Sequence, residues 1–428
     1  MTYAEAIQFL YSLRWFGTKF GLANTFKLSE LAGNPHQRLR FIHVAGTNGK
    51  GSTCAMLESI YRAAGLRVGL FTSPHLIAFG ERIQVNRQLI SETDVVRLVS
   101  ELKPLLASFS ADEHPTFFEV VTVMALRYFA EQKCDLVVWE TGLGGRLDAT
   151  NIVTPFASVI TNIQYDHQKW LGETLASIAA EKAGIIKPGV PVLTATDQPE
   201  ALDVISRQAF NQSAVLSRVQ PGDHAVLLNS IALPLLGAHQ RTNAALAIAT
   251  VRALSSQMPV SDEAVRTGLS LINWPGRLQL INHPSGQKIL LDGAHNIAGA
   301  YTLADALSQY FPHTKPTLVL GILQDKDWEA ICHMLAPLCS RILLAPVPSE
   351  RTTNPSELAT ACQRANPAIP VNSYASLGAA LSETASAPFV LITGSLYLVG
   401  EALELLQQSS PKQQNERGLN EWSAIPSH

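Results

Sequence analysis

Short apolar runs alternate with amphipathic stretches along most of the chain. Runs of strand length begin at Phe41 and recur at 66–71, 135–140, 159–162 and 190–194. Apolar residues return with helical spacing over 4–13, 52–64, 117–130, 174–184 and 242–255. Regular alternation of apolar strands with helices is typical of a parallel sheet covered on both faces. The pattern therefore predicts an α/β fold with a doubly wound, mainly parallel sheet.

The alternation is interrupted over 273–286, where two prolines and two glycines indicate a linker. Beyond it the pattern restarts, with strands expected at 288–292, 317–322, 341–345 and 389–393. We therefore expect a P-loop-type domain over 1–276 and a smaller, Rossmann-like α/β domain over 287–408. The polar residues 409–428 are expected to form a flexible tail.

The stretch from Phe41 to Thr53 predicts a phosphate-binding loop. An apolar strand passes through three closely spaced glycines and then into a helix, and Lys50 lies within the glycine run. Glycine lets backbone N–H groups approach an anion, and the helix N-terminus adds partial positive charge. The match to the usual P-loop is incomplete, because Val44 and Gly51 stand where that motif has glycine and Ser or Thr. A nucleotide triphosphate is still the expected ligand.

Polar residues at three successive strand ends are candidate Mg²⁺ ligands. Glu140 follows a buried strand, Ser73 lies in the loop after 66–71, and His167 follows Asp166. Taken singly, each has an ordinary structural explanation as a turn, cap or strand-end residue. Mg²⁺ prefers oxygen ligands and keeps several waters, so a histidine ligand would be unusual. Their joint occurrence at strand ends favours a metal site.

Composition narrows the function classes. The chain has 428 residues, a net charge of −3, 46% hydrophobic and 16% charged residues, and five cysteines without zinc-site spacing. The absence of a basic surplus disfavours nucleic-acid binding, and no apolar run approaches the length of a membrane span. Reduced thiols and the lack of a basic leader predict a cytoplasmic protein.

Several motifs together resemble folylpolyglutamate synthase/dihydrofolate synthase, a family of the Mur ligase superfamily. They are Gly46-Thr47-Asn48-Gly49-Lys50-Gly51-Ser52, Thr72-Ser73-Pro74-His75-Leu76, the stretch from Glu140 to Asn151, Asp166-His167, the stretch from Glu181 to Lys187, and Asp292-Gly293-Ala294-His295-Asn296. They occur in family order between about 40 and 400. The set is far more specific than its first member alone.

The resemblance implies an ATP- and Mg²⁺-dependent amide ligase that adds L-glutamate to dihydropteroate and to reduced folates through an acyl phosphate. The positions that match nucleotide contacts are Asn48, Gly49, Lys50, Gly51, Ser52, Asn243, Arg277 and Asp292. Those that match the metal ligands are Ser73, Glu140 and His167. The dihydropteroate set is matched by Thr116, Phe118, Leu147, Asp148 and Ala149, and the glutamate side by His295 and Ser395.

Three positions are implied to act in catalysis: Lys50, Lys182 and His295. Lys182 matches a lysine that is carbamylated in relatives, although the sequence alone places it on a helix surface. The Arg146-Leu147-Asp148 form favours an enzyme with both activities. A monomer without nucleic-acid or membrane partners is expected.

Other interpretations remain open on the sequence. A folylpolyglutamate synthase without the dihydropteroate activity would share most of the motifs. A Mur-type peptidoglycan ligase uses the same activation chemistry, but only about 40 residues precede the glycine loop, too few for a domain that binds a UDP group. A GTPase switch should carry Asn-Lys-x-Asp and Asp-x-x-Gly, and neither tetrapeptide occurs. A degenerate ligase kept as a binding module is disfavoured by intact Lys50, Glu140 and His167.

Overall fold

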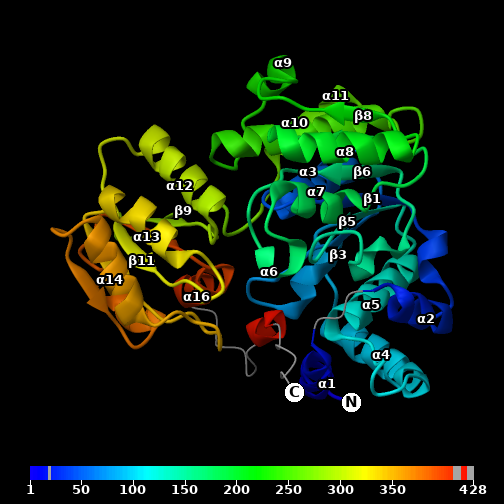
Figure 1. Ribbon diagram of the computed structural model, residues 1–428, viewed down its shortest axis with the longest axis horizontal. Coiled ribbons are helices and arrows are strands. Elements are labelled where there is room, and N and C mark those ends of the chain that lie inside the picture. Colours follow the sequence, from blue (N-terminus) through cyan, green and yellow to red (C-terminus); the bar gives the residue numbers. More distant parts are fainter. Residues whose placement is uncertain (18–20, 408–415, 422–428) are drawn as a thin grey trace. The chain divides into compact units, whose positions relative to one another are not determined.

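The computed structural model describes residues 1–17, 21–407 and 416–421, which divide into two compact units. The first unit comprises Met1–Pro234, Gln240–Asn273 and Leu419–His428, and the second comprises Leu235–His239 and Trp274–Gly418. Their helices and strands are labelled in Figure 1. The hydrophobic pattern did not predict two features of this division. The chain returns to the first unit at Leu419, and Leu235–His239 belong to the second.

The first unit is built on an eight-stranded sheet in the order β4-β3-β2-β5-β1-β6-β7-β8. Its strands are β1 (Phe41–Ala45), β2 (Val68–Phe71), β3 (Ile83–Val85), β4 (Gln88–Leu89), β5 (Leu136–Glu140), β6 (Ala157–Ile160), β7 (Val192–Thr194) and β8 (Leu216–Arg218). All neighbours are parallel except the antiparallel pairs β2–β3 and β3–β4. Central β1 is fully buried and is flanked by β5 and β6, so the loop that follows it lies between two other strand ends.

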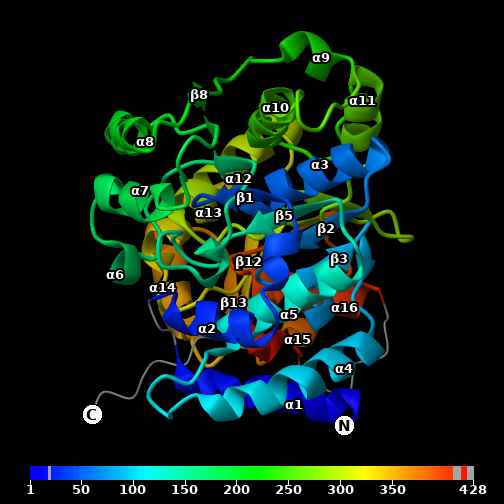
Figure 2. The same ribbon diagram turned by 90° about the vertical axis from the view of Figure 1, so that its right-hand side faces the viewer.

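Helices cover both faces of this sheet, as predicted. The helices are α1 (Tyr3–Ser12), α2 (Ala23–Leu31), α3 (Lys50–Ala63), α4 (Glu92–Leu102), α5 (Phe117–Glu131), α6 (Gln168–Leu171), α7 (Leu175–Ala183), α8 (Pro199–Asn211), α9 (Ala225–Asn229), α10 (Ala238–Ala253) and α11 (Asp262–Ser270). Figure 2 shows α3 and α11 over one face and α5 with α4 over the other. Short 3₁₀ helices lie at η1 (Leu13–Phe16), η2 (Pro35–Arg38), η3 (Phe79–Arg82), η4 (Lys103–Ser108) and η5 (Ala149–Ile152).

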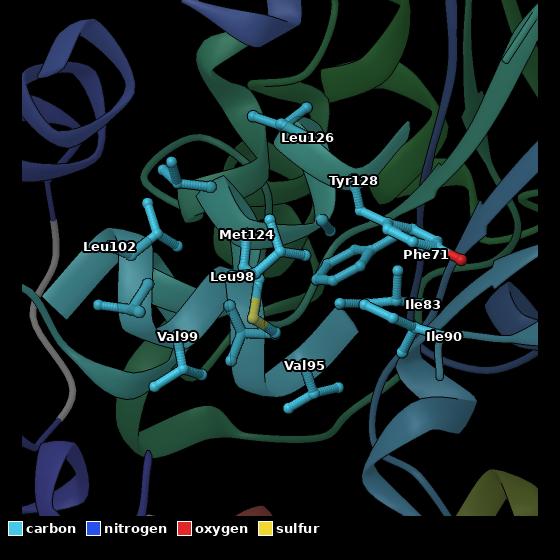
Figure 3. Packing of buried hydrophobic residues seen from close by; sticks show 14 of the residues in the cluster. Phe71, Ile83, Ile90, Val95, Leu98, Val99, Leu102, Met124, Leu126 and Tyr128 are labelled. Carbon is cyan, nitrogen blue, oxygen red and sulfur yellow. The ribbon is translucent and has the colours of Figure 1, made fainter. Parts of the chain in front are cut away.

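The largest buried cluster of this unit lies between α4, α5 and the sheet. Figure 3 shows Leu98 of α4 and Met124 of α5 packed beside Phe71 of β2. The apolar residues of α4 recur every three to four positions, and the Ser91 side chain accepts a hydrogen bond from the Asp94 N–H to cap that helix. This packing holds β2 in place, and with it the start of the loop that follows this strand.

The second unit is also α/β, with a six-stranded sheet in the order β13-β12-β11-β14-β10-β9. Its strands are β9 (Gln279–Asn282), β10 (Lys288–Leu291), β11 (Thr317–Leu320), β12 (Arg341–Leu344), β13 (Val371–Ser373) and β14 (Phe389–Thr393). Its helices are α12 (Ile297–Tyr310), α13 (Trp328–Leu335), η6 (Ala336–Leu338), α14 (Pro355–Ala365), α15 (Leu377–Ser382) and α16 (Leu396–Leu406). Only β9 runs antiparallel to its neighbour in this sheet. The predicted mainly parallel α/β architecture is confirmed for both units.

The predicted linker is partly a hairpin. Within 273–286, residues Gln279–Asn282 form edge strand β9, which pairs with β10. The turn is closed by a hydrogen bond from the His283 N–H to the Gln287 carbonyl, 2.9 Å. The proline and glycine near 284–286 therefore mark a turn between two strands as well as the approach to a new unit.

The predicted flexible tail over 409–428 does not hold for its described part. Residues Glu416–Asn420 form a short 3₁₀ helix, η7, and Leu419 is 1% exposed within the largest core cluster of the first unit. The burial of the Leu419 side chain anchors this mostly polar segment to the core of the first unit. The rest of the predicted tail lies outside the described residues. Among the residues described, no helix is long and apolar enough to cross a membrane.

Candidate active site

The glycine loop joins β1 to α3 and requires glycine at two positions. Gly46 and Gly49 have φ values of 148° and 84°. A Cβ at Gly46 would lie 1.8 Å from Thr161 Oγ1, and one at Gly49 would lie 2.6 Å from Asn243 Oδ1. The loop backbone is therefore packed directly against the residue after β6 and against α10, so Asn243, which the resemblance implies to contact the nucleotide, lies beside the loop.

Residues after β6 hold the loop in shape. The N–H of Thr47 donates to the Asn162 carbonyl at 2.9 Å, and the N–H of Asn48 donates to the Asn162 side chain at 2.8 Å. The Thr53 N–H donates to the Gly49 carbonyl, so the N–H groups of residues 50–52 precede the first bond of α3. Such a helix N-terminus is a preformed anion site. Sequence reasoning missed Asn162 as a support of the loop, although it is the last residue of the strand expected at 159–162.

Two lysines converge on one carbonyl of this loop. Lys50 Nζ donates to the Gly46 carbonyl at 3.1 Å and to the Thr47 carbonyl at 3.3 Å, and Lys182 Nζ from α7 donates to the same Gly46 carbonyl at 2.8 Å. Lys182 is buried, which corrects its expected place on a helix surface. Burial, followed by the charge of Lys50, lowers the pKa of Lys182 to about 7, while Asp166 and Asp148 partly oppose the shift.

Ser73 and Glu140 meet at the edge of the sheet where β2 and β5 end. The register pairs Glu140 with Val44 of β1, which places it next to the glycine loop. Glu140 is 4% exposed, and its Oε2 accepts a hydrogen bond from the Ser73 N–H at 3.0 Å. The Ser73–Pro74 peptide bond is cis. Two of the three predicted metal ligands are thus brought together by the fold.

His167 lies at the start of α6 with φ of 53°, and its N–H donates to Asp166 Oδ1 at 2.8 Å. Within the described residues, no three His, Cys, Asp or Glu side chains form a group that would hold a metal ion. The oxygen donors at Ser73 and Glu140 nevertheless match the preference of Mg²⁺, which binds few protein ligands and completes its shell with phosphate and water. The donor chemistry therefore fits Mg²⁺ at these two residues.

Gln240 is a buried neighbour of the loop that sequence reasoning missed. Its Nε2 donates to Ser52 Oγ at 3.3 Å, and its Oε1 accepts from Asn243 Nδ2 at 3.1 Å. It lies three residues before Asn243 on α10, so both side chains share one helix face. That spacing was the only sequence signal for it.

The second glycine cluster brings Phe118 and Asp148 together around Gly142. A Cβ at Gly142 would lie 2.6 Å from the Phe118 ring and 3.1 Å from Asp148 Oδ2. The Asp148 carboxylate is engaged by its own loop, accepting from the Thr150 N–H at 3.0 Å and the Leu143 N–H at 2.7 Å. Burial raises the pKa of Asp148, and these hydrogen bonds oppose the rise. Asp148 therefore shapes the loop in addition to any contact it makes with a ligand.

The neighbours of these two residues have helix-capping and packing roles. The Thr116 side chain caps α5 by accepting from the Glu119 N–H at 3.3 Å, and Glu119 Oε2 accepts from the Thr116 N–H at 2.7 Å. Leu147 is half-buried and Ala149 is buried in η5. The capping box explains Thr116 without a ligand, so its predicted substrate contact rests on the resemblance alone.

The second unit holds its own cluster of predicted residues. Asp292 follows β10, and its carboxylate accepts from the N–H groups of Leu278 at 2.8 Å and Ala294 at 2.9 Å. A Cβ at Gly293 would lie 2.8 Å from Arg277 Nη1, so Arg277 crosses this turn. Half-buried His239 was missed by sequence reasoning: its partial burial lowers its pKa, and the charge of Asp292 opposes the shift.

The predicted glutamate-side residues stand at two helix starts of the second unit. His295 Nδ1 lies 2.7 Å from the Gly293 carbonyl, which selects the tautomer with Nδ1 protonated and Nε2 as the acceptor. Ser395 is buried and caps α16 by accepting from the Tyr397 N–H at 3.1 Å.

Comparison with known proteins places this geometry in a family. Residues 44–251 match the Mur ligase middle domain, and residues 276–396 match the glutamate ligase domain of Mur ligases. A dihydrofolate synthase/folylpolyglutamate synthase of Bacillus subtilis is 39% identical over 95% of this chain and 99% of its own. The chain belongs to the folylpolyglutamate synthase/dihydrofolate synthase family. The resemblance stated from the motifs is thereby confirmed, and the chain is an ATP-dependent ligase of the Mur superfamily.

Solved structures of the family extend the likeness to the fold. Folylpolyglutamate synthase of Thermotoga maritima superimposes with a TM-score of 0.83 at 34% identity, covering 97% of this chain and 98% of that one. The enzyme of Mycobacterium tuberculosis, complexed with ADP and AMPPCP, gives a TM-score of 0.83 at 31% identity over 92% of this chain and 96% of its own. The GTPase-switch and peptidoglycan-ligase interpretations find no support in these relatives.

Proposed function

We propose that this chain joins L-glutamate to the carboxylate of dihydropteroate and of reduced folates, with ATP and Mg²⁺. The γ-phosphoryl group passes to the acceptor carboxylate, giving an acyl phosphate and ADP. The glutamate amine then attacks the acyl carbon, an amide C–N bond forms, and inorganic phosphate leaves with the former carboxylate oxygen. The observation that carries the proposal is the pair of lysines on the Gly46 carbonyl, at the N-terminus of α3, in a chain of this family.

The phosphate side of this reaction needs positive charge at a fixed place. Phosphoryl transfer to a carboxylate brings two anions together, and preorganised cations lower that barrier. Lys50 sits on loop carbonyls within reach of the α3 N-terminus and would move to the transferring phosphate. Ser73 and Glu140 would hold Mg²⁺, which neutralises phosphate charge when bound. His167 is proposed as a third ligand on the strength of the family resemblance.

The acceptor side is proposed at Phe118 and Asp148. A flat pterin ring stacks on an aromatic face and presents N–H donors to a carboxylate. Phe118 and Asp148 both approach the place that a Gly142 side chain would occupy, so the fold brings the ring and the carboxylate together. Asp148 Oδ1 accepts from both the N–H and the hydroxyl of Thr150, so Oδ2, which accepts from the Leu143 N–H, is the oxygen proposed to receive a pterin N–H. Thr116, Leu147 and Ala149 would complete this set.

In the second unit we propose that Arg277 and Asp292 contact the nucleotide and that His295 and Ser395 serve glutamate. The glutamate amine must be neutral to attack, and the His295 tautomer presents Nε2 as a base for its proton. All five cysteines are free and buried, which fits a reducing, cytoplasmic setting. A monomer is proposed as well, and light scattering in solution tests it.

The proposed activity is tested by an assay that omits one component at a time. Purified protein is incubated with MgATP, L-glutamate and dihydropteroate, and ADP release is measured together with the mass of the pterin product. ADP release that requires all three substrates and matches amide formation in amount supports the proposal. ADP release without a glutamate adduct, or release independent of the pterin, contradicts it.

Bifunctionality gives a prediction at Asp148. Asp148→Ala should lower kcat/KM for dihydropteroate about 10- to 100-fold, the cost of a lost hydrogen bond to a charged group, and lower it less for a reduced folate monoglutamate. Thr150→Val is the matched control, because it removes one hydroxyl that donates to Asp148 while the carboxylate remains. The control should affect both acceptors alike.

Two results would contradict the proposed pterin contact and leave Asp148 with a structural role only. One is an equal loss of both reactions in Asp148→Ala. The other is a wild-type enzyme that is active on folate and inert with dihydropteroate, which identifies a folylpolyglutamate synthase alone.

Carbamylation gives a prediction at Lys182. A neutral amine adds CO₂ and releases a proton to give a carbamate, and a pKa of about 7 makes that amine available at neutral pH. Activity should therefore fall when CO₂ is rigorously removed, and Lys182→Ala should be partly rescued by a small added carboxylate. A ¹³C resonance from labelled bicarbonate on wild type, absent from Lys182→Ala, checks the modification. A fully active enzyme with an unmodified lysine would refute it and leave the ligase standing.

The same lysine predicts the sign of a pH effect on stability. The pKa of Lys182 is about 7 in the folded protein and 10.5 in its ordinary environment. Between these two pH values the unfolded chain therefore binds one proton more at this lysine than the folded protein does. The unmodified protein should gain stability as pH rises from about 7 toward 10.5. Lys182→Met should lose that part of the slope in chemical unfolding measured across the window.

A further inference from the structure

The segment Leu419–Glu421 returns to the first unit and enters a buried polar network beside the site. Asn420 is 5% exposed, and His75 and Arg82 are each 3% exposed. Leu419 belongs to the same core cluster as Phe79 and Phe117. Buried polar groups are costly unless they are paired, so this arrangement is a specific fit and not a chance contact of a chain end.

Both ends of the Asn420 side-chain amide are used. Its Nδ2 donates to the His75 carbonyl at 2.9 Å, and its Oδ1 accepts from Arg82 Nη2. Arg82 Nε in turn donates to His75 Nδ1 at 2.8 Å. One asparagine therefore ties the beginning of the 72–82 loop to its end, across 345 residues of sequence.

The loop that Asn420 holds leads directly to proposed ligand residues. His75 lies two positions after Ser73, whose N–H donates to Glu140. The Arg82 carbonyl accepts from the Thr72 N–H at 3.1 Å, and the Arg82 guanidinium lies 5.4 Å from the centre of the Phe117 ring. Phe117 precedes Phe118, which faces Gly142. The network therefore contacts the loop that carries Ser73, a proposed metal ligand, and the ring of Phe117, which precedes the proposed pterin contact Phe118.

We propose that Asn420 is a positioning residue of the ligase: the C-terminal segment fixes the 72–82 loop so that Ser73 faces Glu140 and the start of α5 holds Phe118 in place. This inference rests on the proposed function. It assigns a role in the site to a part of the chain that the motifs do not reach. The loop also has local support, because the N–H groups of 76–78 donate to the Glu81 carboxylate, so loss of Asn420 should loosen the loop and leave it folded.

The test uses Asn420→Ala in the full-length chain. The apparent constants for Mg²⁺ and for dihydropteroate should rise about tenfold, as expected for lost hydrogen bonds to a buried charged partner. The KM for glutamate should stay within about twofold, because the proposed glutamate residues belong to the second unit. Excess Mg²⁺ should restore much of kcat. Asn420→Asp keeps the acceptor for Arg82 and loses the donor to His75, so its shifts should be smaller.

A readout that does not depend on activity separates this inference from the proposed function. Hydrogen exchange should quicken in peptides that cover 72–82 of Asn420→Ala and remain unchanged in the second unit. Asn372→Ala is the matched control, since Asn372 is exposed on strand β13 of the second unit. The control should change neither exchange in the loop nor any kinetic constant.

Two results would overturn the inference. One is a folded Asn420→Ala protein with wild-type exchange over 72–82 and unshifted constants. The other is a loss of kcat that follows the fraction of folded protein with every apparent constant unchanged. If Asn420→Ala does not fold, Asn420→Asp carries the same comparison. Quickened exchange in a protein that shows no ligase activity even as wild type would instead count against the proposed function.

Discussion

Lys50→Ala is expected to lower kcat about 100- to 1,000-fold, the usual cost of removing a preorganised group that stabilises charge in the transition state. Lys50 is the first residue of α3, and we propose that its ammonium follows the transferring phosphoryl group. The fold should survive, because the Lys50 side chain is only half-buried and donates to loop carbonyls instead of packing in the core. Steady-state kinetics with MgATP, glutamate and dihydropteroate measure the loss.

The control for this variant is Lys315→Ala, which removes an exposed lysine of the second unit and should leave kcat unchanged. Thermal unfolding of both variants shows whether the fold is kept. Turnover within a few-fold of wild type in folded Lys50→Ala would contradict the role of the loop in phosphoryl transfer.

Glu140→Gln should raise the Mg²⁺ concentration needed for half-maximal activity and lower kcat/KM about 10- to 100-fold, because the amide keeps the shape and loses the charge that we propose binds the metal. The amide oxygen can still accept from the Ser73 N–H, so the loop contact and the melting temperature should change little. His167→Ala should show the same change more mildly. Activity titrated against Mg²⁺ is the measurement.

The comparison variant is Glu140→Asp, which keeps the charge and withdraws it by one methylene. It should retain more Mg²⁺ response than Glu140→Gln. If Glu140→Gln and His167→Ala both respond to Mg²⁺ as wild type does, these residues are structural and the metal binds elsewhere.

Hydrophobic periodicity and glycine spacing predicted those parts of the site that are formed by residues close together in the sequence. The β1–loop–α3 unit follows from an apolar run, spaced glycines and a helical period, and the structure shows why glycine is required at 46 and 49. The strand ends at Ser73 and Glu140 were predicted for the same reason, since carboxyl ends of parallel strands meet at one edge of a sheet. The family motifs added Asn243, which lies against Gly49 although it is almost 200 residues away.

Contacts between distant residues could not be predicted in this way. Lys182 sits on an amphipathic helix, and nothing in its own neighbourhood shows that the Gly46 carbonyl lies above it. Gln240 is buried and His239 is half-buried because of their surroundings, and not because of their own hydropathy. The polar segment at 416–421 resembles a disordered tail, and the burial of Leu419 depends on a core formed by residues more than 260 positions before it. Asp148 shows the converse. The motifs predicted a ligand contact for it, whereas the structure shows its carboxylate accepting hydrogen bonds from Leu143 and Thr150 of its own loop.

The acyl phosphate is the central chemical claim, and one isotope measurement tests it directly. Dihydropteroate labelled with ¹⁸O in its carboxylate is turned over with MgATP and glutamate, and the released phosphate is analysed by mass spectrometry. The proposed mechanism transfers one carboxylate oxygen to phosphate, so each phosphate formed should carry one ¹⁸O in proportion to the enrichment of the substrate. Phosphate without the label, or AMP and pyrophosphate in place of ADP and phosphate, would contradict the account.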